Sequence, residues 1–266
     1  MELVPELLRE AATLVLPAFR DESARPEEKA PGEWVTTADH AAESFLTPAL
    51  MSLIPGSLVV GEEAASKNHD VLTRLTTGGW VWLLDPLDGT ANFAAGVEPF
   101  SMMVALLREG EPIASWMHDP VGGDMHVAQR GSGAWSNGAR VSTDPREGPL
   151  IELTGAVLRR FLPDPVAEQI AAAESILGPV LAGSRCAGHD YPSIVRGELD
   201  FALFWRSLPW DHVPGVLFLV EAGGKAARLD GAPYRASDHD RTGLLAAKNE
   251  AVWLALRDLF MPSDQR

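Results

Sequence analysis

The sequence predicts a layered α/β fold made of two halves. Three observations predict it: an amphipathic helical pattern opens the chain, short apolar runs joined by Gly-rich turns follow, and strand and helix patterns then alternate. The first two are typical of an α+β unit with a largely antiparallel sheet, and the third of an α/β unit packed against it. Residues 143–149 are rich in Asp, Pro, Arg, Glu and Gly, so we expect an N-terminal sub-domain at 1–145 and a C-terminal one at 146–266.

Two helices are expected before the first strand. Residues 3–20 place apolar side chains at helical spacing, which indicates an amphipathic helix. Residues 21–32 are charged and contain prolines, which predicts a loop. Thr36 or Thr37 can cap a second helix that runs to about Leu53.

The next apolar runs end in acidic residues. Residues 58–60 lead to Glu62 and Glu63, and residues 80–84 lead to Asp85. Both runs are typical of buried strands, which would deliver these carboxylates at their carboxyl ends.

A meander and then alternating elements complete the pattern. Strands are expected at 101–107, 112–117 and 124–129, and Asn137-Gly138 is a strong hairpin signal. Beyond the boundary we expect strands near 151–154, 179–182, 200–204, 225–229 and 243–246, and helices near 164–174, 189–197, 211–222 and 249–260.

Charge and composition narrow the classes of partner and compartment. The 266 residues carry 22 Lys and Arg against 37 Asp and Glu, a formal net charge of −15. Such a surface disfavours nucleic acid and membrane as partners, but a small phosphorylated substrate fits if a cation neutralises the site. The only cysteine, Cys186, excludes an intramolecular disulfide and a multi-cysteine zinc site. No basic, apolar leader and no apolar run of about 20 residues is present, which predicts a cytoplasmic protein.

The run at 85–93 (DPLDGTANF) is the most informative stretch. Asp85 and Asp88 lie three residues apart, directly after a buried strand, so they can converge on one point. Carboxylates that close repel each other in a partly dry site, and a hard cation such as Mg²⁺ resolves the repulsion. Gly89-Thr90 can start a short helix whose backbone N–H groups receive a phosphate. The alternative is a turn whose aspartates cap that helix and face water; it suits a single Asp better than the whole run.

Two further acidic positions can complete the cluster. Glu62 follows its strand in the same way as Asp85, and Asp211 opens an apolar helix. In the simpler interpretation Asp211 is an N-cap, and a charge at a helix start can both cap and coordinate.

These motifs resemble the inositol monophosphatase family, within the superfamily of lithium-sensitive, magnesium-dependent sugar-phosphate phosphatases. The resemblance extends over roughly residues 3 to 260 and implies an inositol-monophosphatase-like fold. Its motifs occur in the family's order at residues 36–39 (TTAD), 61–63 (GEE), 82–90 (WLLDPLDGT), 131–138 (GSGAWSNG), 210–211 (WD) and 221–224 (EAGG).

The resemblance also implies cofactors and site residues. Two or three Mg²⁺ ions, for which Mn²⁺ can substitute, would be held by Glu62, Asp85, the carbonyl of Leu87, Asp88 and Asp211. The implied catalytic residues, which activate water, are Thr90, Asp39 and Glu62. The implied substrate-binding residues are Asp88, Gly89, Thr90, Gly188, His189 and Asp211. Most metal ligands thus fall in the first sub-domain and substrate-side residues in the second. A homodimer and lithium inhibition are implied as well.

Several residues keep two interpretations. Lys29 lies near where the family often has a functional lysine, although a loop lysine is usually a solvated charge. His189 and Asp190 either line the pocket or start a helix. His212 either touches the site or is an exposed first-turn residue. Cys186 is expected to be a packed thiol. The remaining histidines, at 40, 69, 118, 126, 212 and 239, show no metal-ligand spacing.

The predicted function is a Mg²⁺-dependent phosphomonoesterase that hydrolyses a small phosphorylated metabolite by attack of activated water. Alternatives are a phosphatase of the same superfamily for a nucleoside bisphosphate, a sugar bisphosphate or histidinol phosphate, and a catalytically inactive binding homologue. A haloacid-dehalogenase phosphatase is rejected, because its two Asp are spaced by two rather than three.

The substrate prediction depends on one position. Inositol-preferring members of the family have an acidic residue seven positions before the second-signature Asp, and this chain has Phe204 there. Inositol 1-phosphate is therefore expected to be a poor substrate. Arg206 is either solvated or turned into the pocket, where it would favour a second anionic group.

Overall fold

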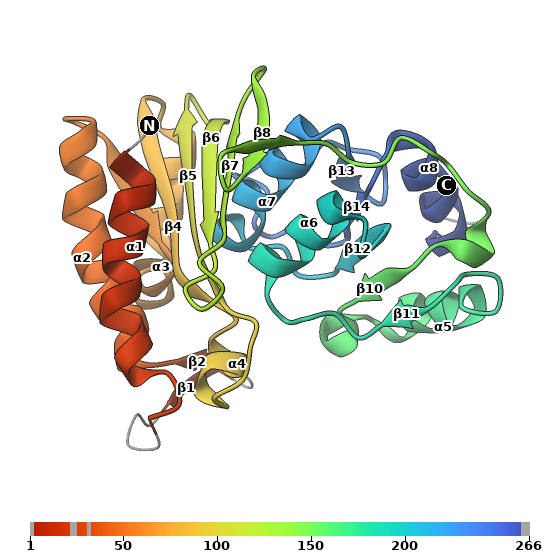
Figure 1. Ribbon diagram of the computed structural model, residues 1–266, viewed down its shortest axis with the longest axis horizontal. Helices are drawn as coiled ribbons and strands as arrows, with labels where there is room; N and C mark the ends of the chain where they lie inside the picture. The colour runs from red at the N-terminus through yellow and green to blue at the C-terminus, as the bar shows by residue number, and fades with distance from the viewer. Residues whose placement is uncertain (1–2, 22–25, 31–32, 262–266) are drawn as a thin grey trace.

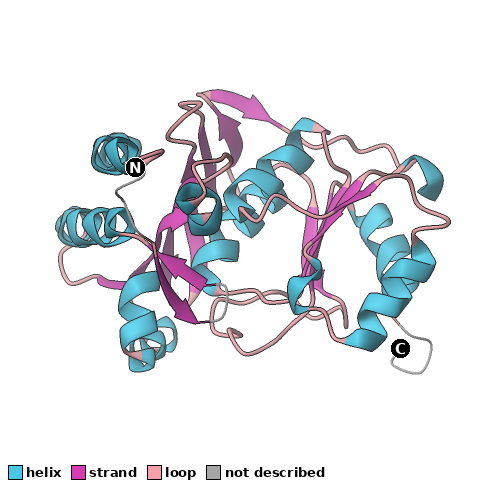
Figure 2. Ribbon diagram, turned by 90° about the horizontal axis from the view of Figure 1, so that it is seen from below, coloured by secondary structure: helices cyan, strands magenta, loops and turns pink. Residues whose placement is uncertain are grey.

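The chain folds into five layers in the order helices, sheet, helices, sheet, helices (Figures 1 and 2). The computed structural model describes residues 3–21, 26–30 and 33–261, without the side chains of residues 29, 30 and 33. The predicted α/β class is confirmed, and the N-terminal sheet is largely antiparallel as expected. Among the described residues, no helix is both long and apolar enough to cross a membrane.

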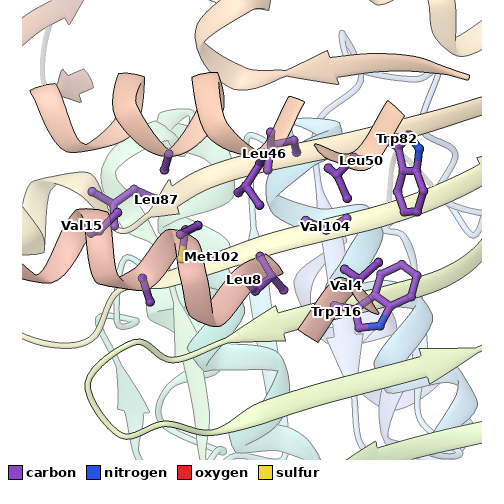
Figure 3. Close-up of a cluster of buried hydrophobic side chains, with 14 of the residues drawn as sticks. Val4, Leu8, Val15, Leu46, Leu50, Trp82, Leu87, Met102, Val104 and Trp116 are labelled. Carbon is purple, nitrogen blue, oxygen red and sulfur yellow. The ribbon is translucent and has the colours of Figure 1, made fainter. Parts of the chain in front are cut away.

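The first layer consists of α1 (Leu3–Val15), which continues into the 3₁₀ turn η1 (Leu16–Ala18), and α2 (Thr37–Leu53). Both helices pack on one face of the first sheet, and Figure 3 shows the shared core. The predicted cap is confirmed, because the Thr36 hydroxyl accepts a hydrogen bond from the backbone N–H of Ala38 at 3.2 Å. The labelled core residues are Val4, Leu8, Val15, Leu46, Leu50, Trp82, Leu87, Met102, Val104 and Trp116.

The prediction of a loop over residues 21–32 is wrong in part. Strands β1 (Glu27–Ala30) and β2 (Glu33–Val35) form a separate two-stranded antiparallel ribbon. A ribbon of two strands at the edge of a molecule needs no buried apolar face, so it leaves no alternation in the sequence. The side chain of Lys29 lies outside the described residues, so its predicted role stays a prediction.

The first sheet has seven strands in chain order, and only the first pair is parallel. Between that pair the chain crosses over through α3 (Glu62–Lys67) and the 3₁₀ helix η2 (His69–Thr76). The predicted hairpin is confirmed: Asn137 and Gly138 have φ of 52° and 78°, as a type I′ turn requires. The strands are β3 (Leu58–Gly61), β4 (Trp80–Asp88), β5 (Ser101–Arg108), β6 (Glu111–His118), β7 (Met125–Gln129), β8 (Gly133–Ser136) and β9 (Ala139–Val141).

The second sheet has mixed strand directions. Its order is β11 (Val180–Leu181), β10 (Gly155–Val157), β12 (Phe201–Phe204), β14 (Leu244–Ala247) and β13 (Lys225–Arg228). The strand expected near 151–154 is instead the 3₁₀ turn η3 (Leu150–Glu152), and the strand begins at Gly155. A short apolar run does not distinguish a turn that packs from a strand that pairs.

Two pairs of helices cover this second sheet. Helices α5 (Asp164–Ala173) and α8 (Glu250–Phe260) lie on its outer face, and α6 (Ala187–Arg196) and α7 (Pro209–Glu221) lie between the two sheets (Figure 2). The central pair packs closely, because a Cβ on Gly215 would lie 1.9 Å from Cδ2 of Tyr191. Helix α7 contacts both sheets. The predicted sub-domain boundary near residue 145 stays a prediction.

Candidate active site

Five carboxylates line one cavity of about 240 Å³, and four of them, from three elements, are those of the predicted acidic cluster. Glu62 begins α3 where β3 ends, and its neighbouring parallel strand β4 carries Asp85 and Asp88. Asp211 lies in the first turn of α7, which reaches the same place from between the sheets. The structure therefore brings together the predicted acidic cluster, including Leu87, which also lines the cavity.

Local chain geometry sets the spacing of the two β4 carboxylates. The pairing of β4 with β5 is irregular between Asp85 and Asp88, at the Pro86 that has no N–H to donate. Oδ1 of Asp85 accepts the N–H of Leu87 at 2.9 Å, and Oδ2 of Asp88 accepts the N–H of Gly188 at 2.7 Å. Backbone donors thus hold both carboxylates in place.

Burial and mutual repulsion make this cluster electrostatically costly. The pKa of Asp85 lies well above its ordinary value because of burial first, and then because of the charges of Glu62, Asp88 and Asp211. Burial also raises the pKa of Asp211, and raises that of Asp88 to about 6. Oxygen donors that repel one another in a dry site match a hard divalent cation, so the donor set fits Mg²⁺.

Thr90 and Asp39 form a second arrangement next to the cluster. The Thr90 Oγ1 lies 3.1 Å from Oδ1 of Asp39 and 2.8 Å from the carbonyl oxygen of Leu87. The other oxygen of Asp39 accepts both the N–H and the hydroxyl of Thr36, at 2.7 and 2.6 Å. Burial raises the pKa of Asp39 to about 6, against the lowering effect of the Thr36 bonds. Asp39 thus completes the cap of α2 and contacts Thr90, which lines the cavity, although Asp39 itself does not line it.

Gly89 gives the turn before α4 (Thr90–Ala94) a conformation that a side chain would obstruct. Its φ is 86°, and a Cβ there would lie 3.0 Å from the carbonyl oxygen of Pro99. Gly89 and Thr90 both line the cavity, as predicted for substrate-binding residues.

The start of α6 forms another part of the cavity wall, and the residues there differ in whether they line the cavity as predicted. Gly188 approaches Ser101 so closely that a Cβ would lie 2.0 Å from the serine Oγ, and its N–H binds Asp88 rather than lining the cavity. Asp190 lines the cavity, and burial raises its pKa to about 7. Cys186 is a buried thiol whose pKa burial raises well above its ordinary value, as expected for a packed residue.

His189 is not among the cavity residues, so the structure gives no support to its predicted contact with substrate. Helical spacing places it on the α6 face that also carries Arg196. Burial lowers the pKa of His189 most, and the charge of Arg196 lowers it further. The adjacent Asp190 occupies the cavity side instead.

Of the two interpretations of His212, an exposed first-turn residue is wrong, and contact with the site agrees with the structure. His212 is 3% exposed and lines the cavity, with Nδ1 3.0 Å from the hydroxyl of Tyr191. Its ring centroid lies 4.6 Å from that of Phe204. Because α7 is covered on both sides by sheets, its first turn is buried. Burial lowers the pKa of His212 to about 3, so the ring is neutral.

Aromatic and cationic side chains form a further part of the cavity wall. Phe204 lines the cavity at the position predicted from sequence, and Arg206 also lines it, with its guanidinium 4.6 Å from the ring centroid of Phe161. Arg160 and Arg185 line the same wall. Sequence reasoning missed Arg160, Phe161 and Arg185, because they lie in turns that no motif marks.

Comparisons with known proteins agree with this geometry. The model of the inositol monophosphatase family matches residues 2–258. An inositol-1-monophosphatase of Rhizobium meliloti is 30% identical over 87% of this chain and 84% of its own. The Nus factor SuhB of Pseudomonas aeruginosa is 32% identical over 88% and 85%, and a histidinol-phosphatase of Chlorobaculum parvum is 29% identical over 94% and 92%. The crystal structure of extragenic suppressor protein suhB from Bartonella henselae superposes with a TM-score of 0.85 at 21% identity, covering 99% of this chain and 98% of that one.

Proposed function

Because the chain belongs to the inositol monophosphatase family, a family of phosphatases, we propose that it is a Mg²⁺-dependent phosphomonoesterase acting on a small phosphorylated metabolite. The observation that carries the proposal is the group of four carboxylates around one cavity, with burial and mutual repulsion raising the pKa of Asp85 and Asp211. Such a cluster is costly in a protein that binds no cation there.

The residues that would hold two or three Mg²⁺ ions are Glu62, Asp85, the Leu87 carbonyl, Asp88 and Asp211. Bound Mg²⁺ would supply the positive charge that neutralises the phosphoryl oxygens and stabilises the leaving oxygen. Because Mg²⁺ and Mn²⁺ share these oxygen donors, Mn²⁺ should also support activity.

Thr90 and Asp39 would position the attacking water. The Thr90 oxygen can accept a hydrogen bond from water while its own proton is donated to Oδ1 of Asp39. Since Asp39 is fixed by Thr36, this chain of bonds holds the water oxygen in one direction. Glu62, which also lines the cavity, would offer a second acceptor for that water.

The part of the cavity wall that carries Phe204 and the arginines favours a substrate with a second anionic group. Phe204 offers no strong acceptor to the hydroxyls of an inositol ring, and an unpaired hydroxyl there would cost about 1–3 kcal/mol. Three arginines at 160, 185 and 206 add positive charge to that wall. We therefore place inositol 1-phosphate among the poor substrates and sugar bisphosphates and nucleoside bisphosphates among the preferred ones. Histidinol phosphate, which carries no second anionic group, is the alternative class that this wall does not favour.

Phosphate release from a panel of phosphate esters tests both the proposed phosphatase activity and the proposed substrate preference. Purified chain in Mg²⁺ is expected to hydrolyse an ester that carries a second anionic group, such as a sugar bisphosphate, at least tenfold more efficiently, in kcat/KM, than inositol 1-phosphate. Equal or better efficiency on inositol 1-phosphate would contradict the substrate proposal and leave the phosphatase proposal intact. No phosphate release from any ester, with Mg²⁺ or Mn²⁺, would favour a binding homologue instead.

A further inference from the structure

Two histidines from different halves of the chain meet at the surface. His69 is the first residue of η2, and His239 and Asp240 lie in the loop between β13 and β14. One donor atom from each of the three side chains lies within 4.8 Å of the others. The absence of a metal-ligand spacing along the chain does not exclude such a group, because spacing says nothing about segments that the fold brings together.

The distances suit a coordination sphere. Nδ1 of His239 lies 3.1 Å from Oδ1 of Asp240. Donors about 2.1 Å from one metal ion lie roughly 3.0–3.4 Å apart when they are neighbours in a tetrahedron or octahedron. This pair already has that separation. The donor atom of His69 lies within 4.8 Å of both, and its exposed side chain can rotate to shorten these distances.

The charges around the group also suit a cation. Asp70 follows His69 directly, and the arginine of the loop, Arg241, forms ion pairs with Asp230 and Asp238. These carboxylates offset the guanidinium charge that would otherwise oppose a metal ion.

We propose that His69, His239 and Asp240 form a second metal site that is selective for Zn²⁺ over Mg²⁺. Two imidazoles and one carboxylate are the donors of borderline transition ions, whereas Mg²⁺ prefers oxygen donors only. None of the three residues lines the active-site cavity. Because one ligand belongs to the crossover between β3 and β4 and two belong to the β13–β14 loop, bound Zn²⁺ joins the two halves and stabilises the folded chain.

Equilibrium dialysis of the tag-free, full-length chain against Zn²⁺ tests the site, with excess Mg²⁺ present to occupy the carboxylate cavity. The wild-type chain is expected to retain one Zn²⁺, and His69→Asn and His239→Asn are each expected to bind it at least tenfold more weakly. His189→Asn and Asp258→Asn are matched controls that should bind as the wild type does.

Two further measurements keep the test independent of phosphatase activity. Zn²⁺ should raise the melting temperature of the wild-type chain but not of His239→Asn, and Cu²⁺ in the same site should give an electron paramagnetic resonance spectrum with coupling to two nitrogens. Equal Zn²⁺ binding by the wild type and His239→Asn would overturn the proposal, since the ion would then lie elsewhere. Absence of Zn²⁺ binding would overturn it too, whether or not the chain releases phosphate.

Discussion

The hydroxyl oxygen of Thr90 lies 3.1 Å from Oδ1 of Asp39, which joins the start of α4 to the first turn of α2. The carboxylate makes this contact with one oxygen while its other oxygen binds Thr36 at the cap of α2. Asp39 is fully buried, so it cannot turn towards solvent. A helix cap thereby fixes the direction of a group in the active site.

Thr90→Ala is expected to lower kcat by about 100-fold while KM changes by less than about threefold, because the hydroxyl would orient water in the transition state rather than bind the ground state. Steady-state phosphate release with Mg²⁺ checks this. Thr90→Ser keeps the hydroxyl and should recover most of kcat. A change in KM alone would make Thr90 a substrate-binding residue.

Arg206→Gln is expected to raise KM about tenfold for esters with a second anionic group, since it removes one charge from the cavity wall. The KM for a phosphate ester with an otherwise neutral substituent should stay nearly constant. Arg257→Gln, at an arginine paired with Asp258 on α8, is the matched control. An equal rise in KM for both classes of ester would show that Arg206 does not recognise a second anion.

His126 predicts how stability changes in weak acid. It is 5% exposed, its Nδ1 lies 2.8 Å from the hydroxyl oxygen of Ser136, and burial lowers its pKa from 6.5 to about 4. Between these values the unfolded chain binds the proton more readily, so stability rises with pH in this window and is lost as pH falls through it. The free energy of unfolding, measured with urea, should therefore fall between pH 7 and pH 5 by roughly 2 kcal/mol more in the wild type than in His126→Gln.

The pH comparison with His126→Gln cancels contributions from other groups, such as the buried His212, because both proteins contain them. Identical losses in the two proteins between pH 7 and pH 5 would mean that the ring of His126 reaches solvent or a counter-charge when it is protonated.

The fold was predictable where side-chain periodicity and burial coincide. The helix cap at Thr36, the hairpin turn at Asn137-Gly138 and the strands of the meander are confirmed, because each leaves a local signal. The β1–β2 ribbon and the shift of β10 to Gly155 were missed, since an exposed ribbon and a short apolar turn leave no distinct period. Local pattern predicts elements better than it predicts their edges.

The residues of the candidate site could be predicted where they belong to one sequence motif. They could not be predicted where the tertiary fold brings distant segments together. The acidic cluster around Asp85 follows from strands that end side by side. Arg160 and Phe161 were missed because they lie far along the chain from the acidic motifs, and only the tertiary fold brings them to the same cavity. His189 and Asp190 are adjacent in sequence, and only the rotation of α6 decides which one faces the cavity.

Phosphate release by the wild type and Asp88→Asn, across a titration of Mg²⁺ and in chelator, tests most directly whether the carboxylate cluster makes this chain a metal-dependent phosphatase. Asparagine keeps an oxygen that can accept the Gly188 N–H, so the fold should remain intact by thermal unfolding while one ligand charge is lost. We expect wild-type turnover to require Mg²⁺ or Mn²⁺, to collapse in chelator, and to fall by about 100-fold or more in Asp88→Asn. Near-normal turnover of Asp88→Asn at saturating substrate, or wild-type turnover that persists in chelator, would contradict it.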